Sequence, residues 1–372
     1  MSGRKHLFFL LAALSVALAP SFSAAQATVA GAATDQRLTW RLQRLWQIGG
    51  GEDESLLLSQ LFEKDLATDR RGRLFVVDRT ENRIVVYDST GREVRTYGKR
   101  GPGPGELMGP LWVEVRHDER VLVGDAEKNA VVVYAADGTA EPEFRLTPRL
   151  RSARALPSGT YIGPRAPSRD SMSLVAVSNA APVTLLKMAV PLPKSMRPVC
   201  RLTDYPAGPI FAPSLTWAAR GDRVVASTGG FEIRVFRGTT LQRTLTRATP
   251  RRNSTAALAR QHLGPGETVE LFGMPPCTVP AAMILSVAEI SPTLPAYSTL
   301  TLAPDERIWA TRYVVRGEPG LVDIYHPERG YEGTLALGAV RPAAFLSNGV
   351  LISLERDEDG VPLLVAYRVS RN

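Results

Sequence analysis

A glycine- and proline-rich stretch with two adjacent basic residues is the first candidate for chemistry: YGKRGPGPGELMGP, residues 97–110. Phosphate-binding loops present backbone N–H groups at a helix N-terminus, typically in the pattern GxxxxGK[ST]. Here Lys99 precedes the glycines, no Ser or Thr follows them, and Pro102 and Pro104 lack the backbone donor. We therefore expect this stretch to be a connector that turns the chain, not a phosphate site.

Acidic and histidine residues that could bind a metal are few and dispersed. DAEKN (125–129) and RDEDG (356–360) offer carboxylates, but neither completes a calcium loop with alternating oxygen ligands and a distal glutamate. His117, His262 and His326 lie far apart, without the HxH, HxxxH or HExxH spacing of zinc sites. We expect no metal and no cofactor, with a divalent metal such as calcium as the alternative.

The sequence contains no GxSxG elbow for a Ser-His-Asp hydrolase, so no catalytic residue is assigned. Two tryptophans, Trp112 and Trp217, occupy corresponding places before β-rich segments. Exposed aromatic side chains favour ligands or protein partners, whereas buried ones pack in a core. We take both tryptophans as candidates to face a ligand, with core packing as the alternative.

The elements that must position these residues come from an internal repeat. Residues 66–91 and 113–138 align without gaps at an offset of 47 residues and share eight of 26 positions. Each copy passes from a β-rich segment such as RLFVVD through a polar turn to a second segment such as RIVVYD and a turn with glycine. This pattern predicts consecutive β-hairpins. Weaker copies have β-rich segments that begin near residues 160, 223, 307 and 349.

The first copy, LFVVDRTENRIVVYDSTG, resembles the NHL-type β-propeller repeat in its order of strand, Asp, Asn-Arg-Ile, aromatic residue, Asp and Gly. The stretch GPGPGELMGP between the copies resembles the connector of exported bacterial six-bladed propellers. The strong resemblance covers residues 66–146. Propeller enzymes include metal-dependent lactonases and amidating lyases, so the fold that the resemblance implies does not by itself settle the function.

We therefore predict an all-β fold, a β-propeller with six blades, with seven as the alternative. The whole mature chain gives seven units of about 49 residues, but removing an insertion at 241–296, with a short helix at 256–263, leaves six of about 48. The last copy ends near the C-terminus without an outer strand. We predict that residues 38–49 pair with residues 361–369 and close the ring, which hides two sheet edges.

The N-terminus has the features of an export signal: basic residues, an apolar stretch from Leu7 to Pro20, and a small-residue cleavage site ending at Ala27. The apolar stretch is short for a membrane span, which needs about twenty residues. We expect residues 1–27 to be removed. Residues 28–372 would then form one propeller domain, periplasmic or secreted, with no integral membrane span and no cysteine for a lipid anchor.

Cys200 and Cys277 are the two cysteines of the chain, and an oxidising compartment allows a disulfide between them. Two free, buried thiols are the alternative. The formal net charge of +8 falls to +6 without Arg4 and Lys5. Because the basic residues are interleaved with acidic ones instead of clustered, we expect no nucleic-acid partner.

Together these features predict an exported β-propeller scaffold that binds a protein, peptide or glycan through its blade loops and central channel, without catalysis. A metal-dependent propeller enzyme of the lactonase or lyase type is the alternative. A structural component of the cell envelope is a further one.

Overall fold

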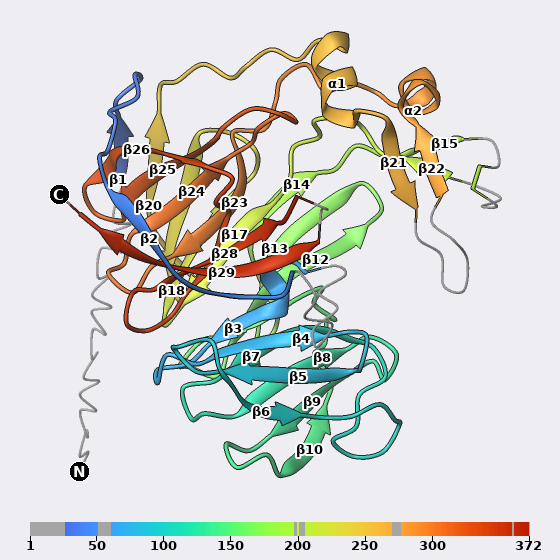
Figure 1. The fold of residues 1–372 in the computed structure, drawn as a ribbon, viewed down its shortest axis with the longest axis vertical. Coiled ribbons are helices and arrows are strands. Elements are labelled where there is room, and N and C mark those ends of the chain that lie inside the picture. The colour runs from blue at the N-terminus through green and yellow to red at the C-terminus, as the bar shows by residue number, and fades with distance from the viewer. Residues whose placement is uncertain are drawn as a thin grey trace, which may run out of the picture.

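The computed structural model describes residues 27–50, 61–196, 199–200, 205–269, 277–358 and 361–371. Within these residues, six antiparallel sheets form the blades of a six-bladed β-propeller, as the repeat predicted (Figure 1). The expected export segment, residues 1–27, lies outside the described residues except for Ala27. In the described part, no helix is long and apolar enough to cross a lipid bilayer.

Each blade contains four antiparallel strands, which follow one another from the central channel outward. In that order, blades 1 to 3 consist of β3 (Leu66–Thr68), β4 (Leu74–Asp78), β5 (Arg83–Tyr87) and β6 (Glu93–Tyr97); β7 (Pro110–Val115), β8 (Val121–Asp125), β9 (Ala130–Tyr134) and β10 (Ala140–Phe144); and β11 (Arg154–Ala155), β12 (Tyr161–Ser168), β13 (Ser171–Val177) and β14 (Val183–Ala189). Blades 4 to 6 consist of β17 (Thr216–Arg220), β18 (Arg223–Ser227), β19 (Glu232–Arg237) and β20 (Thr240–Arg247); β23 (Tyr297–Leu302), β24 (Ile308–Arg312), β25 (Gly320–His326) and β26 (Gly330–Gly338); and β27 (Pro342–Phe345), β28 (Leu351–Arg356), β29 (Pro362–Ser370) and β2 (Arg41–Ile48).

The two strongest repeat copies form blades 1 and 2, and their second, third and fourth strands lie 47 residues apart, as the alignment predicted. Asn82 and Asn129 occupy equivalent turns with φ angles of 53° and 51°. Asparagine tolerates this left-handed conformation better than most residues. Asp78 and Asp125 accept hydrogen bonds from backbone N–H groups of the same turns. The shared Asp and Asn residues are therefore explained by the turn between the second and third strands.

The middle strands of the blades are buried on both faces because each blade packs against a neighbour on either side. Every residue of β4 and β8 is buried, and their apolar side chains enter the cores between blades. The outer strand β6 is instead exposed at four of its five residues. Apolar burial between blades, at about 25 cal/mol per Å², therefore favours continuous Val, Leu and Ile runs in the middle strands.

The N-terminal strand closes the ring as predicted. β2 pairs antiparallel with β29, from Arg41 opposite Ser370 to Ile48 opposite Leu364. Blade 6 therefore takes three strands from the C-terminal end of the described chain and its outer strand from the N-terminal end. This pairing covers the sheet edge that β29 would otherwise expose.

The residues before β2 contact two further blades, which the sequence did not predict. Strand β1 (Ala27–Gly31) pairs parallel with β20 and becomes a fifth strand of blade 4 (Figure 1). The backbone groups of Gln36 and Leu38 then hydrogen-bond to Thr334 on the outer strand of blade 5, at 2.7 and 2.9 Å. We call residues 27–48 the N-terminal belt, because they join the outer strands of three consecutive blades.

The insertion predicted at 241–296 begins later than expected, because β20 continues to Arg247 as the outer strand of blade 4. The helix predicted inside it is present with the expected bounds. The connector before blade 4 contributes too, so two consecutive connectors build one small unit, which we call the connector module (Figure 1). It contains β15 (Lys194–Met196), β16 (Tyr205–Ala207), α1 (Ala256–Leu263), β21 (Gly266–Val269), β22 (Cys277–Pro280) and α2 (Ala281–Val287).

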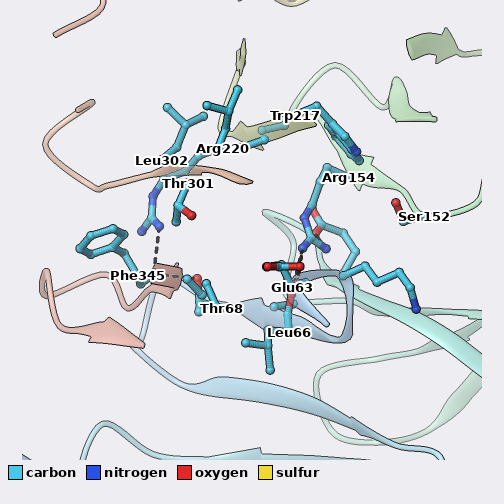
Figure 2. A pocket seen from close by; sticks show the side chains of 18 of the residues that line it. Glu63, Leu66, Thr68, Ser152, Arg154, Trp217, Arg220, Thr301, Leu302 and Phe345 are labelled. Carbon is cyan, nitrogen blue, oxygen red and sulfur yellow. Dashed lines mark hydrogen bonds and ion pairs between the residues drawn. The ribbon is translucent and has the colours of Figure 1, made fainter. Parts of the chain in front are cut away.

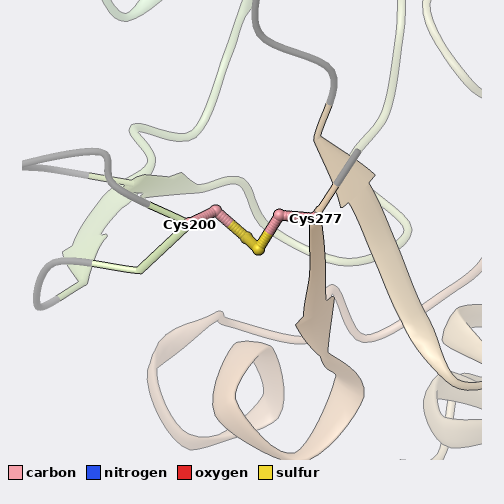
Figure 3. The surroundings of a disulfide bond; sticks show 2 residues. All are labelled: Cys200 and Cys277. Atoms are coloured by element: carbon pink, nitrogen blue, oxygen red, sulfur yellow. A yellow bond between two sulfur atoms is a disulfide. The ribbon is translucent and has the colours of Figure 1, made fainter. Parts of the chain in front are cut away.

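The connector module has an apolar core of its own, which includes Phe211, Leu263 and Ile284. A disulfide joins Cys200 in the first connector to Cys277 in the second, with a Cα–Cα distance of 5.6 Å (Figure 3). The disulfide therefore links the connectors before and after blade 4 covalently.

A buried ion cluster ties blades 4 and 5 to the N-terminal belt. The fully buried carboxylate of Asp323 on β25 accepts hydrogen bonds from Arg247 at 3.0 Å and from Arg312 at 2.8 and 3.0 Å. Asp35 of the belt forms ion pairs with both arginines. Two arginines thus face two aspartates, and the charges of the cluster balance.

Candidate functional site

The innermost strands of all six blades line a central channel of about 820 Å³. In each blade the fourth strand runs antiparallel to the first, so every connector begins and ends on the same face of the propeller. The six innermost strands consequently run through the channel in one direction. The volume lies in the range of small-molecule sites, about 300–1,000 Å³.

Arg154, at the start of β11, crosses the channel wall to two other blades. Its guanidinium donates to the carbonyl oxygens of Val113 in blade 2 at 2.8 Å and Leu66 in blade 1 at 2.9 Å. It also forms an ion pair with the Glu114 carboxylate at 3.3 Å. The charge of Arg154 is thereby compensated, and two carbonyls on the free edges of innermost strands are satisfied.

Arg220, at the end of β17, is a second arginine that crosses the wall (Figure 2). It donates to the carbonyl oxygen of Phe345 in blade 6 at 3.0 Å, and the hydroxyl of Thr68 in blade 1 donates to the same oxygen at 3.1 Å. Burial lowers the pKa of Arg220, and no acidic residue counteracts this effect. Arg220 is therefore a half-buried cation that is held only by a neutral carbonyl within the described structure.

Two glutamates of the channel have carboxyl groups that are poorly solvated. Burial raises the pKa of Glu114 despite the opposing influence of Arg154. Burial is also the largest cause of the raised pKa of Glu63, and the charge of Asp65 adds to it. The Glu63 side chain is exposed at the channel wall, but protein surrounds this space on most sides, which accounts for the incomplete solvation of its carboxylate.

The channel lining combines charged side chains, hydroxyl groups and the aromatic side chains of Phe62, Trp217 and Phe345. The charged residues of the lining are Lys64, Arg70, Arg116, Arg154 and Arg220 on the basic side and Glu63, Asp69 and Glu114 on the acidic side. The hydroxyl groups belong to Thr68, Ser152, Ser214, Thr216, Ser298, Thr299, Thr301 and Ser347. Lys64 and Arg116 pair with Asp65 and Asp118, which lie outside the lining. The half-buried Arg220 has no acidic partner in the described structure, so the channel favours a polar ligand with negative charge.

The two tryptophans named from the sequence have different locations. Trp217 lies on β17, is half-buried and lines the channel, so it remains a candidate ligand contact (Figure 2). For Trp112 the prediction of a ligand-facing side chain is wrong. Trp112 is 3% exposed and packs between blades 2 and 3. Gly124 on the neighbouring strand makes room for it, since a Cβ there would lie 2.1 Å from the indole ring.

The stretch 97–110 is the connector between β6 and β7, as predicted, and its polar groups have partners within the fold. The Lys128 ammonium donates to the carbonyl oxygens of Gly103 at 3.0 Å and Glu106 at 3.2 Å. One oxygen of Asp125 accepts two backbone N–H groups of the connector, at 2.7 and 3.1 Å. These contacts fix the connector on blade 2.

The remaining candidates for metal chemistry lie apart from one another. His117 is exposed at the channel rim, His262 packs beside Tyr313 in the connector module, and His326 ends β25. Among the residues that the structure describes, no group of three or more His, Cys, Asp or Glu side chains is arranged to hold a metal ion. The end of the acidic motif 356–360 lies outside them.

Sequence reasoning missed the polar residues of the channel, Glu63, Glu114, Arg154 and Arg220. They occupy or adjoin innermost strands, which lie at the margin of the repeat pattern or in its weaker copies. The position of each residue on, or just before, the first strand of a blade is the sequence signal that could have indicated a channel location.

Comparison with known proteins supports the fold. A family model described as a 6-bladed beta-propeller matches residues 61–162, and no curated protein matches the chain. A Bacteroides fragilis protein described as exported is similar in structure, with a TM-score of 0.53 at 12% identity over 93% of this chain and 100% of the other. A DUF4221 family member from Bacteroides vulgatus has a TM-score of 0.48 at 11% identity over 90% and 99%. A streptogramin B lyase has a TM-score of 0.40 at 12% identity over 89% and 98%. At 12% identity, the likeness to the Bacteroides fragilis protein extends to the fold alone. The chain is a six-bladed β-propeller.

Proposed function

We propose that this chain is an exported, non-catalytic binding protein of the NHL-like propeller type, whose ligand, a peptide, a glycan or a segment of a partner protein, enters the central channel. One observation carries the proposal: a channel of about 820 Å³ is lined by polar side chains from all six blades. Half-buried polar groups in a concave site of this size are the usual basis of ligand orientation.

The surrounding fold supports binding because it holds the channel wall rigid. Arg154 of blade 3 donates to the carbonyl oxygen of Leu66 in blade 1, and Arg220 of blade 4 donates to that of Phe345 in blade 6. Each arginine thus skips the adjacent blade. The N-terminal belt joins the outer strands of blades 4, 5 and 6. A wall that is pre-organised in this way loses little conformational entropy when a ligand binds.

Export is supported by the signal-like N-terminal sequence and by the disulfide, since disulfides persist in oxidising compartments. The structurally similar Bacteroides fragilis protein is itself described as exported. Periplasmic or secreted location follows as part of the proposal.

A channel-filling variant tests the binding site. Ser298 is an exposed residue of the channel wall, so Ser298→Trp reduces the channel without entering a core. Ala180→Trp, in an exposed turn of blade 3, is the matched control. Calorimetric titration would use neutral and acidic disaccharides and capped tripeptides as probes.

We expect at least one probe to bind the wild-type chain and the Ala180→Trp variant, and to lose its affinity in Ser298→Trp. Binding that is unchanged in Ser298→Trp, or no binding by any probe, would contradict a channel site. Chemical conversion of a bound probe during the titration would contradict the non-catalytic part of the proposal.

A further inference from the structure

Arg220 differs from the other half-buried cations of the channel in its missing counter-charge. Arg154 pairs with Glu114 at 3.3 Å, Arg116 with Asp118 at 3.1 Å, and Lys64 with Asp65 at 3.1 Å. Arg220 forms no ion pair within the described structure, and its one hydrogen-bond acceptor is the carbonyl oxygen of Phe345.

This arrangement leaves most of the hydrogen-bonding capacity of Arg220 unused. An arginine side chain carries five N–H donors in a planar fork that matches the two oxygens of a carboxylate. Only one guanidinium nitrogen, Nη1, has an acceptor in the described structure. The hydroxyl of Thr68, which shares that acceptor at 3.1 Å, lies beside the guanidinium and could turn toward a bound anion (Figure 2).

A desolvated cation without a partner is costly for the fold unless an anion occupies the site in the functional state. A singly charged anion suits the channel better than a strongly charged one, because Glu63 and Glu114 add negative charge to the same space.

The free edges of the innermost strands argue for a compact ligand. An extended peptide would gain affinity by pairing with unpaired backbone groups of these strands. Several of the edge carbonyls already accept side-chain donors: those of Leu66 and Val113 from Arg154, that of Phe345 from Arg220 and Thr68, and that of Pro342 from Thr301. A strand-like ligand would have to displace these contacts.

We infer that Arg220 binds the carboxylate of a compact, singly charged organic acid inside the channel, of the kind that an acidic sugar of a glycan ligand presents. This inference rests on the proposed function of the channel and adds the chemical class of the ligand. Trp217 lies on the same strand and also lines the channel. Its ring packs in part against the core between blades 3 and 4, and its exposed part can contact the remainder of such a molecule.

Matched pairs of acids and neutral analogues test the inference: benzoate with benzamide, acetate with acetamide, and D-glucuronate with D-glucose. Ligand-observed NMR titrations would give the dissociation constants for the wild type, Arg220→Gln, Arg220→Lys and the control Arg237→Gln. Arg237 is an exposed arginine of the same blade, and glutamine at position 220 retains a donor for the Phe345 carbonyl. Circular dichroism and thermal melting of each variant would show that the fold is intact.

We expect at least one acid to bind the wild type about tenfold or more tightly than its neutral analogue, as a charge-assisted contact requires. Arg220→Gln should lose that preference, Arg220→Lys should keep part of it because the charge remains without the fork, and Arg237→Gln should keep all of it.

The other outcomes separate the inference from the proposed function. Neutral analogues that bind as tightly as the acids, and are excluded by Ser298→Trp, would overturn the inference and leave the channel site standing. Acid binding that is unaffected by Arg220→Gln would overturn the inference as well. A capped tripeptide with a free carboxylate that binds more tightly than every compact acid would refute the compact ligand. No binding by any probe would contradict both proposals.

Discussion

Replacing Asp323 by asparagine should destabilise the propeller more than the loss of an exposed ion pair would. The reason is that it removes the central negative charge of the buried cluster. The substitution keeps the size of the side chain but presents an amide to Arg247 and Arg312. Both arginines then retain only Asp35 as an acidic partner, and the side chain of Asp35 is 44% exposed.

Breaking a buried ion pair by removing one partner costs about 3–5 kcal/mol. Because Asp35 continues to compensate part of the charge, we expect the lower end of this range for Asp323→Asn, about 3 kcal/mol. With a urea dependence of about 3 kcal/mol per molar, the unfolding midpoint should fall by about 1 M. Asp222→Asn is the matched control, because Asp222 and Arg237 form an exposed pair at 3.4 Å, with 55% and 65% of their side chains accessible. It should cost less than about 1 kcal/mol.

Urea denaturation followed by tryptophan fluorescence would measure both variants at neutral pH. A midpoint for Asp323→Asn no lower than that of Asp222→Asn would refute the reasoning. A double-mutant cycle adds a second check: Arg247→Met should cost less in the Asp323→Asn background than in the wild type, because the buried charge that it removes has already lost its main partner.

Three further changes probe the connector module, the N-terminal belt and the channel. The disulfide closes a sequence separation of 77 residues, so replacing both Cys200 and Cys277 by serine should destabilise the connector module by about 4 kcal/mol; hydrogen exchange in α1 that is no faster than in the wild type would contradict this. Deleting residues 27–36 removes β1 and Asp35, and differential scanning calorimetry should show a lower melting temperature; an unchanged value would mean that the belt contributes nothing. The raised pKa of Glu63 means that its carboxyl gains charge only as the pH rises through that raised value, so benzoate affinity should fall over this range in the wild type. The fall should be smaller in Glu63→Gln, in which Glu114 is the remaining glutamate of the channel with a raised pKa; a fall of equal size in both proteins would exclude Glu63 as the cause.

The sequence contained enough information for the fold because its signals are local. Asp78 and Asn82 recur as Asp125 and Asn129 since the same tight turn requires them, and the apolar runs around them recur because middle strands are buried on both faces. The pairing of β2 with β29 followed from counting strands, since the last copy lacked one. These features depend on residues that are close in the sequence, or on the requirement that each blade has four strands.

The channel could not be predicted in the same way, because its residues meet only through the closure of the ring. Arg220 and Phe345 are 125 residues apart, and no pattern in the sequence relates them. Trp112 shows the converse difficulty. Its place in an innermost strand suggested exposure, but the small neighbour Gly124 allows it to pack between blades. The connector module was recognised only in part, since its first half, before blade 4, is shorter and has no helix among its described residues.

The central claim is that the channel is a ligand site with Arg220 as its counter-charge. A crystal structure of the full chain soaked with benzoate tests it most directly. We expect ligand density inside the channel, with the carboxylate within hydrogen-bond distance of the Arg220 guanidinium. Density only on the connector module or the outer strands, with an empty channel at saturating benzoate, would contradict it.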